Sequence, residues 1–544
     1  MKNIHILDCT LRDGGRIIDC AFPDKEIQDI SNRLSDAKID IVEVGFLRDW
    51  RNVEYKGNST FFTDVDQIRP FVDKSKKRTM YVAFIDYGMF DFDSLKPYDG
   101  TSIDGIRFGF TKKDYTEHYA DIIRSAEIIK KCGYKLFVQG VNSLNYSDKE
   151  ILELVEMIND IKPYSFGIVD TYGAMYIDDV DRIFSLIDHN MDPQICINFH
   201  SHNNYQLSFG FAQEVIRLSK GIRNIIIDAT LNGMGKVAGN LNTELIVDYL
   251  VRKLHYDYEF EDILDIIDDY IYKYSIDHDW GYSIPGMMAG IYKSHPNNII
   301  YLTEKFRLAT KDISNLLSMI EPAARQRYDY DNIEKLYMEY VADKVDDAET
   351  VNRLKEIVGD KEILIMVPGN SLNIYRNQID DYIKEHDIAV ISVNFVPDYE
   401  NAICFFGNQK RYNKTVDKQR GRQVIISSNV KSLGESDIVV NYHSLINRGY
   451  KYFENSTLML LNLLKRMGVT KITIAGFDGF NKESRNNYTD ETFQNDRHIV
   501  EFDELNTEIQ EMLQVLAKTL AGKCRIEFIT PSIYEEVVEG AQRN

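Results

Sequence analysis

Asp8-Cys9-Thr10-Leu11-Arg12-Asp13-Gly14-Gly15 directly follows a short β-branched run, Ile4–Leu7. Such a run is typical of a buried strand, so the polar residues after it would lie at the carboxyl end of that strand. Seven similar runs follow along the chain: Ile39–Gly45, Thr79–Ile85, Gly105–Phe110, Lys135–Gly140, Ser165–Val169, Ile195–Phe199 and Asn224–Ile227.

Most gaps between these runs hold an amphipathic segment, such as residues 24–34. Alternation of strands and helices predicts parallel strands joined by crossover helices. Eight such units over about 250 residues match a closed (β/α)₈ TIM barrel. An open doubly wound sheet is the alternative, and in either fold polar side chains at the carboxyl ends of the strands would form the site.

The remaining chain divides into two parts. Residues 251–345 favour helices (Phe260–Tyr274, Ile300–Leu317 and Asn332–Val341) and are interpreted as a helical appendix to the barrel over residues 1–250. A polar stretch at 343–347 is a plausible linker. Strand–helix alternation then resumes over 346–544, where five strands fit: Glu362–Val367, Ala389–Asn394, Gln423–Ser427, Asp437–Asn441 and Lys471–Ala475. This number predicts an open, Rossmann-like α/β domain.

Charge and composition exclude several classes of protein. The 544 residues include 64 Lys and Arg against 85 Asp and Glu, a net charge of −21, which would repel nucleic acid. Six scattered Cys without a C-x-x-C pair indicate a reducing, cytoplasmic interior. The chain has no stretch of 18 consecutive apolar residues, so no membrane span is predicted. The first residues fit a strand and not a signal peptide. The sequence leaves open whether the chain forms a homo-oligomer.

His200 and His202 are two residues apart at the end of the seventh strand, so both rings would point to one face. Strands 7, 8 and 1 are neighbours in a closed barrel, so Asp13 and Asn240 could reach the same ion. Two nitrogens and two oxygens suit octahedral Mg²⁺ or Mn²⁺ better than tetrahedral zinc. The alternative is a pair of ordinary surface histidines.

Arg12 lies beside the predicted metal ligand Asp13. Its charge cannot be removed near neutral pH, and a fixed cation next to a metal suits an enolate or oxyanion. The alternative is a structural salt bridge to Glu43 or Asp170. Thr230, at the end of the eighth strand, is a further candidate for substrate binding.

Three separated motifs resemble the DRE-TIM metallolyase superfamily, which includes 4-hydroxy-2-oxoacid aldolases, hydroxymethylglutaryl-CoA lyase and the isopropylmalate and homocitrate synthases. They are residues 8–14, His200-Ser201-His202-Asn203 and residues 235–240. The resemblance covers about residues 1–310. It implies a divalent metal on Asp13, His200 and His202, joined in some members by Asn240, an enolate stabilised by Arg12, and substrate near Glu43 and Asp170.

Arg16 departs from this resemblance, because aldolase relatives carry an acid/base His at its position. A guanidinium does not release its proton near neutral pH, so Arg16 is predicted to bind a substrate anion. Proton transfer would fall to Tyr282 or His295, whose alternatives are plain packing and helix capping. The nearest resemblance is to aldolase-like proteins found with bacterial surface-polysaccharide enzymes.

In the C-terminal part, Pro368-Gly369-Asn370-Ser371 follows the first strand. In a unit of strand, turn and helix, the backbone amides of the turn and the amino terminus of the helix could face an anion. A plain capped turn is equally compatible with this sequence. Asn394 and Asp478 would face the same crevice. The pattern faintly resembles sialyltransferase-like and pterin-pyrophosphokinase-like (DUF115) proteins, which implies a nucleotide or nucleotide-sugar site at Gly369, Asn370, Ser371, Asn394 and Asp478.

The sequence therefore predicts a metal-dependent aldolase or lyase, acting on a 2-oxo acid and an aldehyde through a pyruvate-type enolate with Mn²⁺ or Mg²⁺, with a surface-polysaccharide pathway as its context. One alternative is a Claisen synthase that uses an acyl-CoA. Another is a degenerate barrel attached to a nucleotide-sugar binding or transferase domain.

Overall fold

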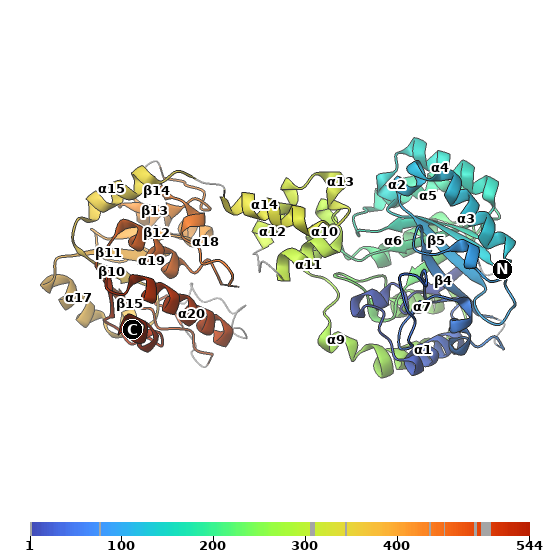
Figure 1. Ribbon diagram of the computed structural model, residues 1–544, viewed down its shortest axis with the longest axis horizontal. Coiled ribbons are helices and arrows are strands. Elements are labelled where there is room, and N and C mark those ends of the chain that lie inside the picture. Colours follow the sequence, from blue (N-terminus) through green and yellow to red (C-terminus); the bar gives the residue numbers. More distant parts are fainter. Residues whose placement is uncertain are drawn as a thin grey trace. The chain divides into compact units, whose positions relative to one another are not determined.

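The computed structural model describes residues 3–75, 78–304, 310–342, 345–434, 437–450, 452–482, 487–490 and 502–543. These residues form two compact units, one from the described residues of 1–303 and 309–330, the other from those of 304–308 and 331–544. Figure 1 labels the elements of each unit, which are described separately. The boundaries expected near residues 250 and 345 stay predictions.

The first unit is a closed barrel of eight parallel strands, with β1 paired to both β9 and β2. This closure confirms the predicted barrel and excludes the open sheet. A short strand, β3 (Phe61–Phe62), adds to β2 outside the ring. The barrel strands are β1 (Ile4–Asp8), β2 (Ile41–Leu47), β4 (Met80–Asp86), β5 (Gly105–Phe110), β6 (Lys135–Gly140), β7 (Ser165–Asp170), β8 (Cys196–Ser201) and β9 (Ile225–Ala229).

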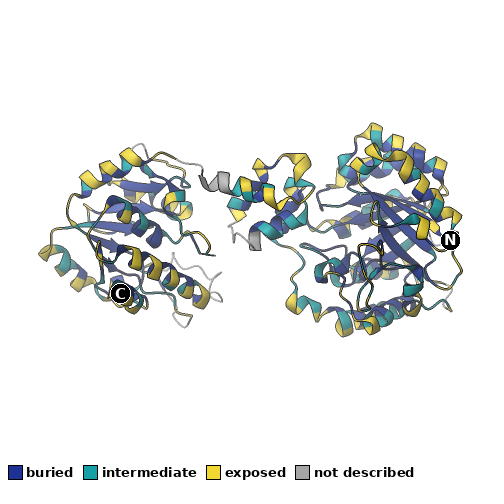
Figure 2. Cartoon of the chain, in the orientation of Figure 1, coloured by how far each residue is buried: buried dark blue, intermediate teal, exposed yellow. Residues whose placement is uncertain are grey.

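Helices surround the barrel with their apolar faces inward and exposed faces outward (Figure 2). Helix α4 shows why: Ser147 and Glu150 form a capping box at its start, and Ile151, Leu154 and Ile158 recur on its buried face. The outer helices are α1 (Asp24–Asp36), α2 (Lys112–Glu117), α3 (Tyr119–Lys131), α4 (Asp148–Ile161), α5 (Ile177–Asn190), α6 (Ser208–Leu218) and α7 (Thr243–Leu254).

The barrel interior changes from apolar to charged along its axis. Leu7, Ile41, Val82, Phe137, Cys196 and Ile226 belong to one buried apolar cluster. Side chains two positions further along a strand share its inward face, and on four of these strands they are Glu43, Gln139, Asn198 and Asp228. The polar layer therefore lies above an apolar plug, toward the carboxyl ends of the strands.

The appendix consists of short helices: α8 (Phe260–Ile266), a π-helical turn (Ile267–Ile271), α9 (Tyr274–Asp277), α10 (Ile284–Tyr292), α11 (Pro296–Glu304), α12 (Thr310–Met319) and α13 (Pro322–Arg325). The helix predicted over Ile300–Leu317 overlaps α11 and α12, and its residues 305–309 lie outside the described residues. Among the described residues, no helix combines the length and hydropathy needed to cross a membrane.

The second unit holds a parallel sheet of seven strands in the order β14-β13-β12-β11-β10-β15-β16. An open α/β sheet was predicted correctly, but five strands was too few, because β12 and β16 were missed. The strands are β10 (Glu362–Met366), β11 (Ile388–Val393), β12 (Ile403–Phe406), β13 (Val424–Ser427), β14 (Ile438–Val440), β15 (Lys471–Ala475) and β16 (Arg525–Phe528).

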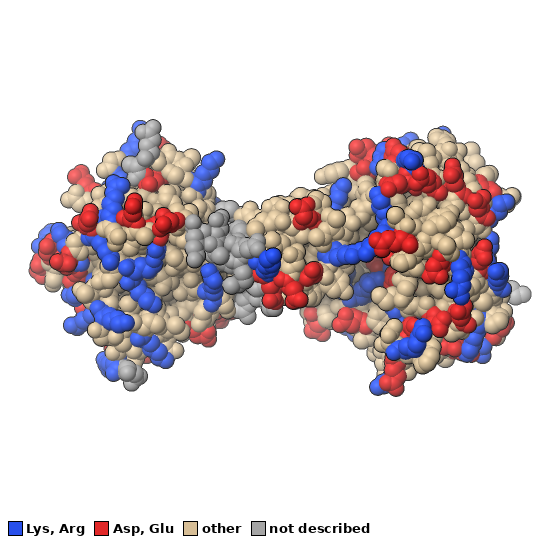
Figure 3. Space-filling model, turned by 45° about the horizontal axis from the view of Figure 1, so that its top comes forward, with Lys and Arg blue, Asp and Glu red and all other residues tan. Residues whose placement is uncertain are grey.

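The helices assigned wholly or mostly to this unit are α14 (Tyr330–Ala342), α15 (Ala348–Val358), α16 (Ser371–Ile374), α17 (Arg376–Glu385), α18 (Gln409–Thr415), α19 (Ser456–Met467), α20 (Phe502–Leu520) and α21 (Glu535–Arg543). Asp347, predicted as linker, is buried and accepts bonds from Arg466 (2.5 and 2.8 Å) and the Asn441 amide (2.8 Å). It therefore belongs to the folded part. Side chains of both charges cover both units in Figure 3.

Candidate active site at the carboxyl end of the barrel

A cavity of about 300 Å³ opens where the barrel strands end. Side chains from the strand ends and from the appendix line it together. Six residues predicted for the site line this cavity: Arg12, Asp13, Arg16, His200, His202 and His295. The lining adds residues that were not predicted, among them Asp86, Arg107, Gln139, Lys236 and Tyr328.

The loop after β1 is held by two residues of its own motif. Asp8 accepts bonds from the Thr10 amide (2.9 Å) and the Thr243 hydroxyl (2.6 Å), and the Thr10 hydroxyl accepts from the Leu231 amide (2.8 Å). Burial raises the pKa of Asp8 to about 6. With the loop fastened in this way, Arg12 and Asp13 face the cavity.

Asp13, His200 and His202 bring three potential metal-ligand atoms within 4.8 Å of one another. Asp13 Oδ2 lies 3.2 Å from His202 Nε2 and 3.8 Å from His200 Nε2. Burial acts to raise the pKa of Asp13, but the charge of Arg12 and the histidines outweigh it, and the pKa lies well below its usual value. The carboxylate is therefore ionised, as a metal ligand must be.

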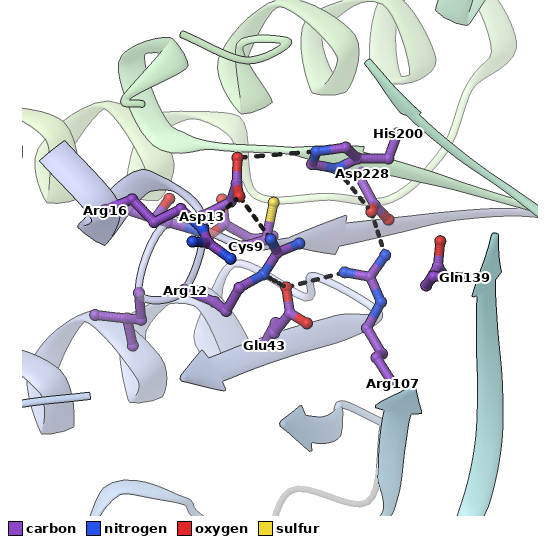
Figure 4. Close-up of polar contacts among 12 residues, drawn as sticks. Cys9, Arg12, Asp13, Arg16, Glu43, Arg107, Gln139, His200 and Asp228 are labelled. Atoms are coloured by element: carbon purple, nitrogen blue, oxygen red, sulfur yellow. Dashed lines mark hydrogen bonds and ion pairs between the residues drawn. The ribbon is translucent and has the colours of Figure 1, made fainter. Parts of the chain in front are cut away.

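The other ring nitrogen of each histidine is held by a hydrogen bond. His200 Nδ1 is 3.0 Å from Asp228 Oδ2, and His202 Nδ1 is 3.1 Å from the Asp170 carbonyl (Figure 4 shows the first). Both acceptors favour the proton on Nδ1, which leaves the Nε2 lone pairs toward Asp13. This is the arrangement that orients metal-ligating histidines.

Asn240 is the residue predicted to add an oxygen ligand to the cluster of Asp13, His200 and His202. Its backbone bridges that of His202, and its amide nitrogen donates to the Met234 carbonyl (3.1 Å). Its Oδ1 is buried and has no hydrogen-bond partner within the described residues. Asn240 does not line the cavity, but its orphaned amide oxygen, the Asp13 carboxylate and two imidazoles are all donor types that a hard divalent ion accepts.

Arg12 and Arg107 are joined through Glu43 beneath the cavity (Figure 4). Arg12 donates to Glu43 (2.7 Å) and Asp13 (2.6 Å), and Arg107 donates to Glu43 (2.9 Å) and Asp228. Burial acts to lower the pKa of Arg107, but Asp228 and Glu43 outweigh it, so the pKa is raised. The network fixes Arg12 at one end and, through Asp228, His200 at the other.

Several predicted site residues have structural partners and do not line the cavity. Glu43 bridges the two arginines, and the Asp170 carboxylate accepts from the amides of Ala174 (2.8 Å) and Met175 (3.2 Å). The Thr230 hydroxyl donates to the Met234 carbonyl (2.8 Å). Tyr282 is 59% exposed, and its hydroxyl lies 3.8 Å from Met287 Sδ. The structure does not bring Tyr282 to the cavity.

The cavity mouth carries two cations and a histidine. Arg16 lies 3.4 Å from Asp13 Oδ1 and over the ring of Phe46. Burial lowers the pKa of Lys236, and the charge of Arg16 lowers it further. Burial, Lys236 and Arg16 together lower the pKa of His295 to about 4. The mouth is therefore a place where positive charge is crowded.

Sequence reasoning missed Arg107, Gln139 and Lys236. Arg107 had a signal, since it is the one charged residue in the buried run Gly105–Phe110. Gln139 also follows the inward period of its strand, and Gly167 leaves room for it, because a Cβ there would lie 1.9 Å from its Oε1. Lys236 lies within the motif at residues 235–240, in which only Asn240 was predicted to take part in the site.

In the second unit, Gly369, Asn394 and Asp478 line a separate cavity, and Asn370 and Ser371 do not. Asp478 accepts bonds from the amide (2.8 Å) and the hydroxyl of Ser371. The first-turn amide expected to face an anion is therefore already bonded to a carboxylate.

Residues 101–269 match the family model described as HMGL-like. The match covers about a third of the chain, all of it within the first unit. This match confirms the predicted resemblance to the DRE-TIM superfamily for the barrel, whereas the resemblance proposed for the C-terminal part is unconfirmed.

Two curated relatives are named 4-hydroxy-2-oxovalerate aldolase. That of Moorella thermoacetica is 24% identical over 323 residues, covering 57% of this chain and 90% of the relative. That of Carboxydothermus hydrogenoformans is 25% identical over 324 residues, with the same coverage. Among solved structures, the HMG-CoA lyase of Brucella melitensis is 14% identical, with a TM-score of 0.39, covering 49% of this chain and 96% of that chain.

Proposed function

We propose that the barrel is a divalent-metal-dependent lyase that makes or breaks a carbon–carbon bond through the enolate of a 2-oxo acid. The observation that carries this proposal is the Asp13–His200–His202 cluster beside a buried Arg12. The relatives named as aldolases support the reaction class.

When bound, the metal would supply positive charge next to the oxo and carboxylate oxygens of the substrate. Arg12 is held to Asp13 and Glu43, so its guanidinium keeps one orientation while charge develops on the enolate oxygen. The cation also lies 4.6 Å from the Phe84 ring centroid, which shields it from water on one side. Arg12 therefore stabilises the enolate without reorganising.

The direct test is exchange of deuterium from solvent into the methyl group of pyruvate. With Mn²⁺ present, wild-type protein should catalyse this exchange without any aldehyde, because enolisation precedes bond formation. Exchange into acetyl-CoA but not into pyruvate would instead favour the acyl-CoA synthase. Absence of exchange into either compound would favour a degenerate barrel. The polysaccharide context stays a prediction.

The second substrate is expected to carry a negative charge of its own. Arg16 and Lys236 both line the cavity, and Lys236 forms no ion pair within 4 Å among the described residues, although Asp19 and Asp13 attract it from farther away. A carboxylate or phosphate on the aldehyde would offset this charge, and Arg16 can bind it through two parallel bonds. The proposed acceptor is therefore an anionic aldehyde.

Lys236→Met and Arg16→Gln should each raise KM for an anionic aldehyde about tenfold, the effect of losing roughly 1.4 kcal/mol of binding. Their kcat at saturation should change much less. Steady-state aldol kinetics with an anionic and a neutral aldehyde will separate the effects, and Lys220→Met, an exposed lysine on the same barrel, is the matched control. Equal losses with both aldehydes would contradict an anion site.

His295 is placed to donate a hydrogen bond. Its Nδ1 accepts from the Asn297 amide (3.1 Å), so in the neutral ring the proton lies on Nε2. Because the pKa of His295 is lowered, the ring is neutral at physiological pH. A neutral donor can stabilise a developing alkoxide, but it is not a base at Nε2.

The pKa of His295 should therefore be measured near 4, and not near 6.5. Lys236→Met should raise it, because removing a nearby cation makes protonation easier. An NMR titration of the His295 ring measures its pKa in the wild type and in Lys236→Met. Comparison with His295→Asn assigns the signal to this ring. A midpoint near 6.5 that does not move in Lys236→Met would show that His295 is solvated and does not face the cations.

A further inference from the structure

The second unit has a cavity of its own at the point where the strand order reverses. β10 pairs with β11 on one side and with β15 on the other. The sheet continues beyond β11 to β14 and beyond β15 to β16, so the strand order reverses at β10. Ligands of open parallel sheets bind in the crevice outside such a switch point. A cavity of about 340 Å³ lies there, within the size range of small-molecule sites.

Its lining is basic although the chain as a whole is acidic. Lys410, Arg411 and Lys414 line the cavity from α18, and Asp478 is the one acidic residue among the described lining residues. The chain carries a net charge of −21, so this local excess of positive charge runs against the composition. Arg411 lies 5.3 Å from the Tyr488 ring centroid, which holds its guanidinium at the cavity.

The first turn of α19 adds a second attraction for an anion. Asn455, Ser456 and Thr457 line the cavity, and the helix continues to Met467. Asn455 Oδ1 caps this turn by accepting from the Thr457 (3.1 Å) and Leu458 (3.3 Å) amides, so the helix contributes the partial positive charge of its amino terminus and not these two amides. A Cβ at Gly407, two residues before α18, would lie 2.8 Å from Ser456 Oγ, so the start of α18 and the first turn of α19 meet and favour negative charge at the same end of a ligand.

The wall formed by Asp478 carries negative charge instead. Asp478 fastens the turn after β10 by accepting from Ser371, and its carboxylate also borders the cavity. A phosphate is therefore disfavoured at this wall, where a hydroxyl could still donate to the carboxylate. The ligand that fits has an anion at one end and hydroxyl groups at the other.

Aromatic rings complete the lining. Phe480 stacks on Phe502 with ring centroids 5.1 Å apart, and Tyr488 meets the edge of the same pair at 6.1 Å. Phe480 is partly exposed, so one of these rings presents an open surface to the cavity. A sugar or base ring can pack against it.

We propose that this cavity binds the phosphate ester of a hydroxylated molecule, a nucleoside phosphate or a sugar phosphate. The phosphate would lie against α18 and the first turn of α19, and the hydroxyl groups would lie toward Asp478. This placement differs from the turn after β10, which was one of two interpretations that the sequence left open for that turn. The proposal is independent of the barrel reaction.

Isothermal titration of the full chain tests it, with UDP, UDP-glucose, glucose 1-phosphate, inorganic phosphate and uridine as probes. At least one phosphate ester should bind with a Kd below about 1 mM and more tightly than inorganic phosphate or uridine. Lys410→Ala/Lys414→Ala should weaken that binding at least tenfold. Lys418→Ala, an exposed lysine just beyond α18 that does not line the cavity, should change it less than twofold.

The arms of this experiment separate the two sources of the phosphate. Tighter binding of UDP than of glucose 1-phosphate identifies a nucleoside phosphate, and Phe480→Ala should then weaken UDP further. The reverse order identifies a sugar phosphate. The proposal is overturned if no ester binds, if inorganic phosphate binds as tightly as the esters, or if the double variant binds like wild type.

Discussion

Asp13→Ala is expected to lose tight Mn²⁺ binding and to slow the barrel reaction at least about 10³-fold. Changes to the partners that merely orient ligands cost roughly 10- to 100-fold in affinity or activity, so loss of a ligand itself should cost more. Asp13 Oδ2 faces both histidine Nε2 atoms, and no other acidic residue among those described joins this cluster. The fold should survive, because Arg12 keeps Glu43 as its partner.

Calorimetric titration with Mn²⁺ measures the loss, and circular dichroism checks the fold. His189→Ala removes an exposed histidine from α5 of the same barrel and should keep wild-type affinity. Full metal occupancy in Asp13→Ala would show that the ion binds elsewhere.

The wild-type affinity should also depend on pH. Burial acts to lower the pKa of His202, but Asp13 outweighs it, so the pKa is raised and a proton competes with the metal. The affinity should therefore strengthen as pH rises through this pKa and weaken as pH falls.

The barrel could be predicted from sequence because each strand is a short, nearly continuous apolar run between polar segments. Strands buried on both faces have this pattern, and all eight lie within two residues of their predicted positions. The second sheet was harder. β12 (Ile403–Phe406) is a short apolar run that was not recognised as a strand. β16 (Arg525–Phe528) alternates charged and apolar residues at the sheet edge, so it does not stand out as a run.

The cluster of Asp13, His200 and His202 was predictable for a topological reason, because closure of the barrel makes strands β8, β9 and β1 neighbours and brings these residues together. The supporting layer was not. Glu43 lies within β2 and Asp170 at the end of β7, and only packing shows that one bridges two arginines and the other caps a loop. Sequence gives the strand position of a carboxylate but not its partner.

The helical appendix illustrates another limit of prediction from sequence. Tyr282 and His295 lie on either side of α10, and both were candidates for the same role. The helix carries His295 to the cavity and leaves Tyr282 exposed, a choice made by how the appendix docks. Local pattern contains no information about docking, so the two residues could not be distinguished beforehand.

Arg12→Lys is expected to lower kcat by about 10²- to 10³-fold, the usual effect of removing one preorganised donor to a developing oxyanion. Arg12 spans two carboxylates at once, with Nε on Glu43 and Nη1 on Asp13. A lysine keeps one charge but has a single ammonium group, so it cannot hold both bonds in the same plane. The charge would remain near the enolate without its fixed direction.

Metal binding separates this outcome from a collapse of the site. Asp13, His200 and His202 are unchanged in Arg12→Lys, so the Mn²⁺ affinity should stay within about threefold while pyruvate exchange falls. Arg48→Lys is the matched control, because Arg48 pairs with Asp86 (2.8 Å) but does not line the cavity. Unchanged exchange together with reduced thermal stability would make Arg12 a structural partner of Glu43, and Arg107, held by the same carboxylate, would then be the cation to test next.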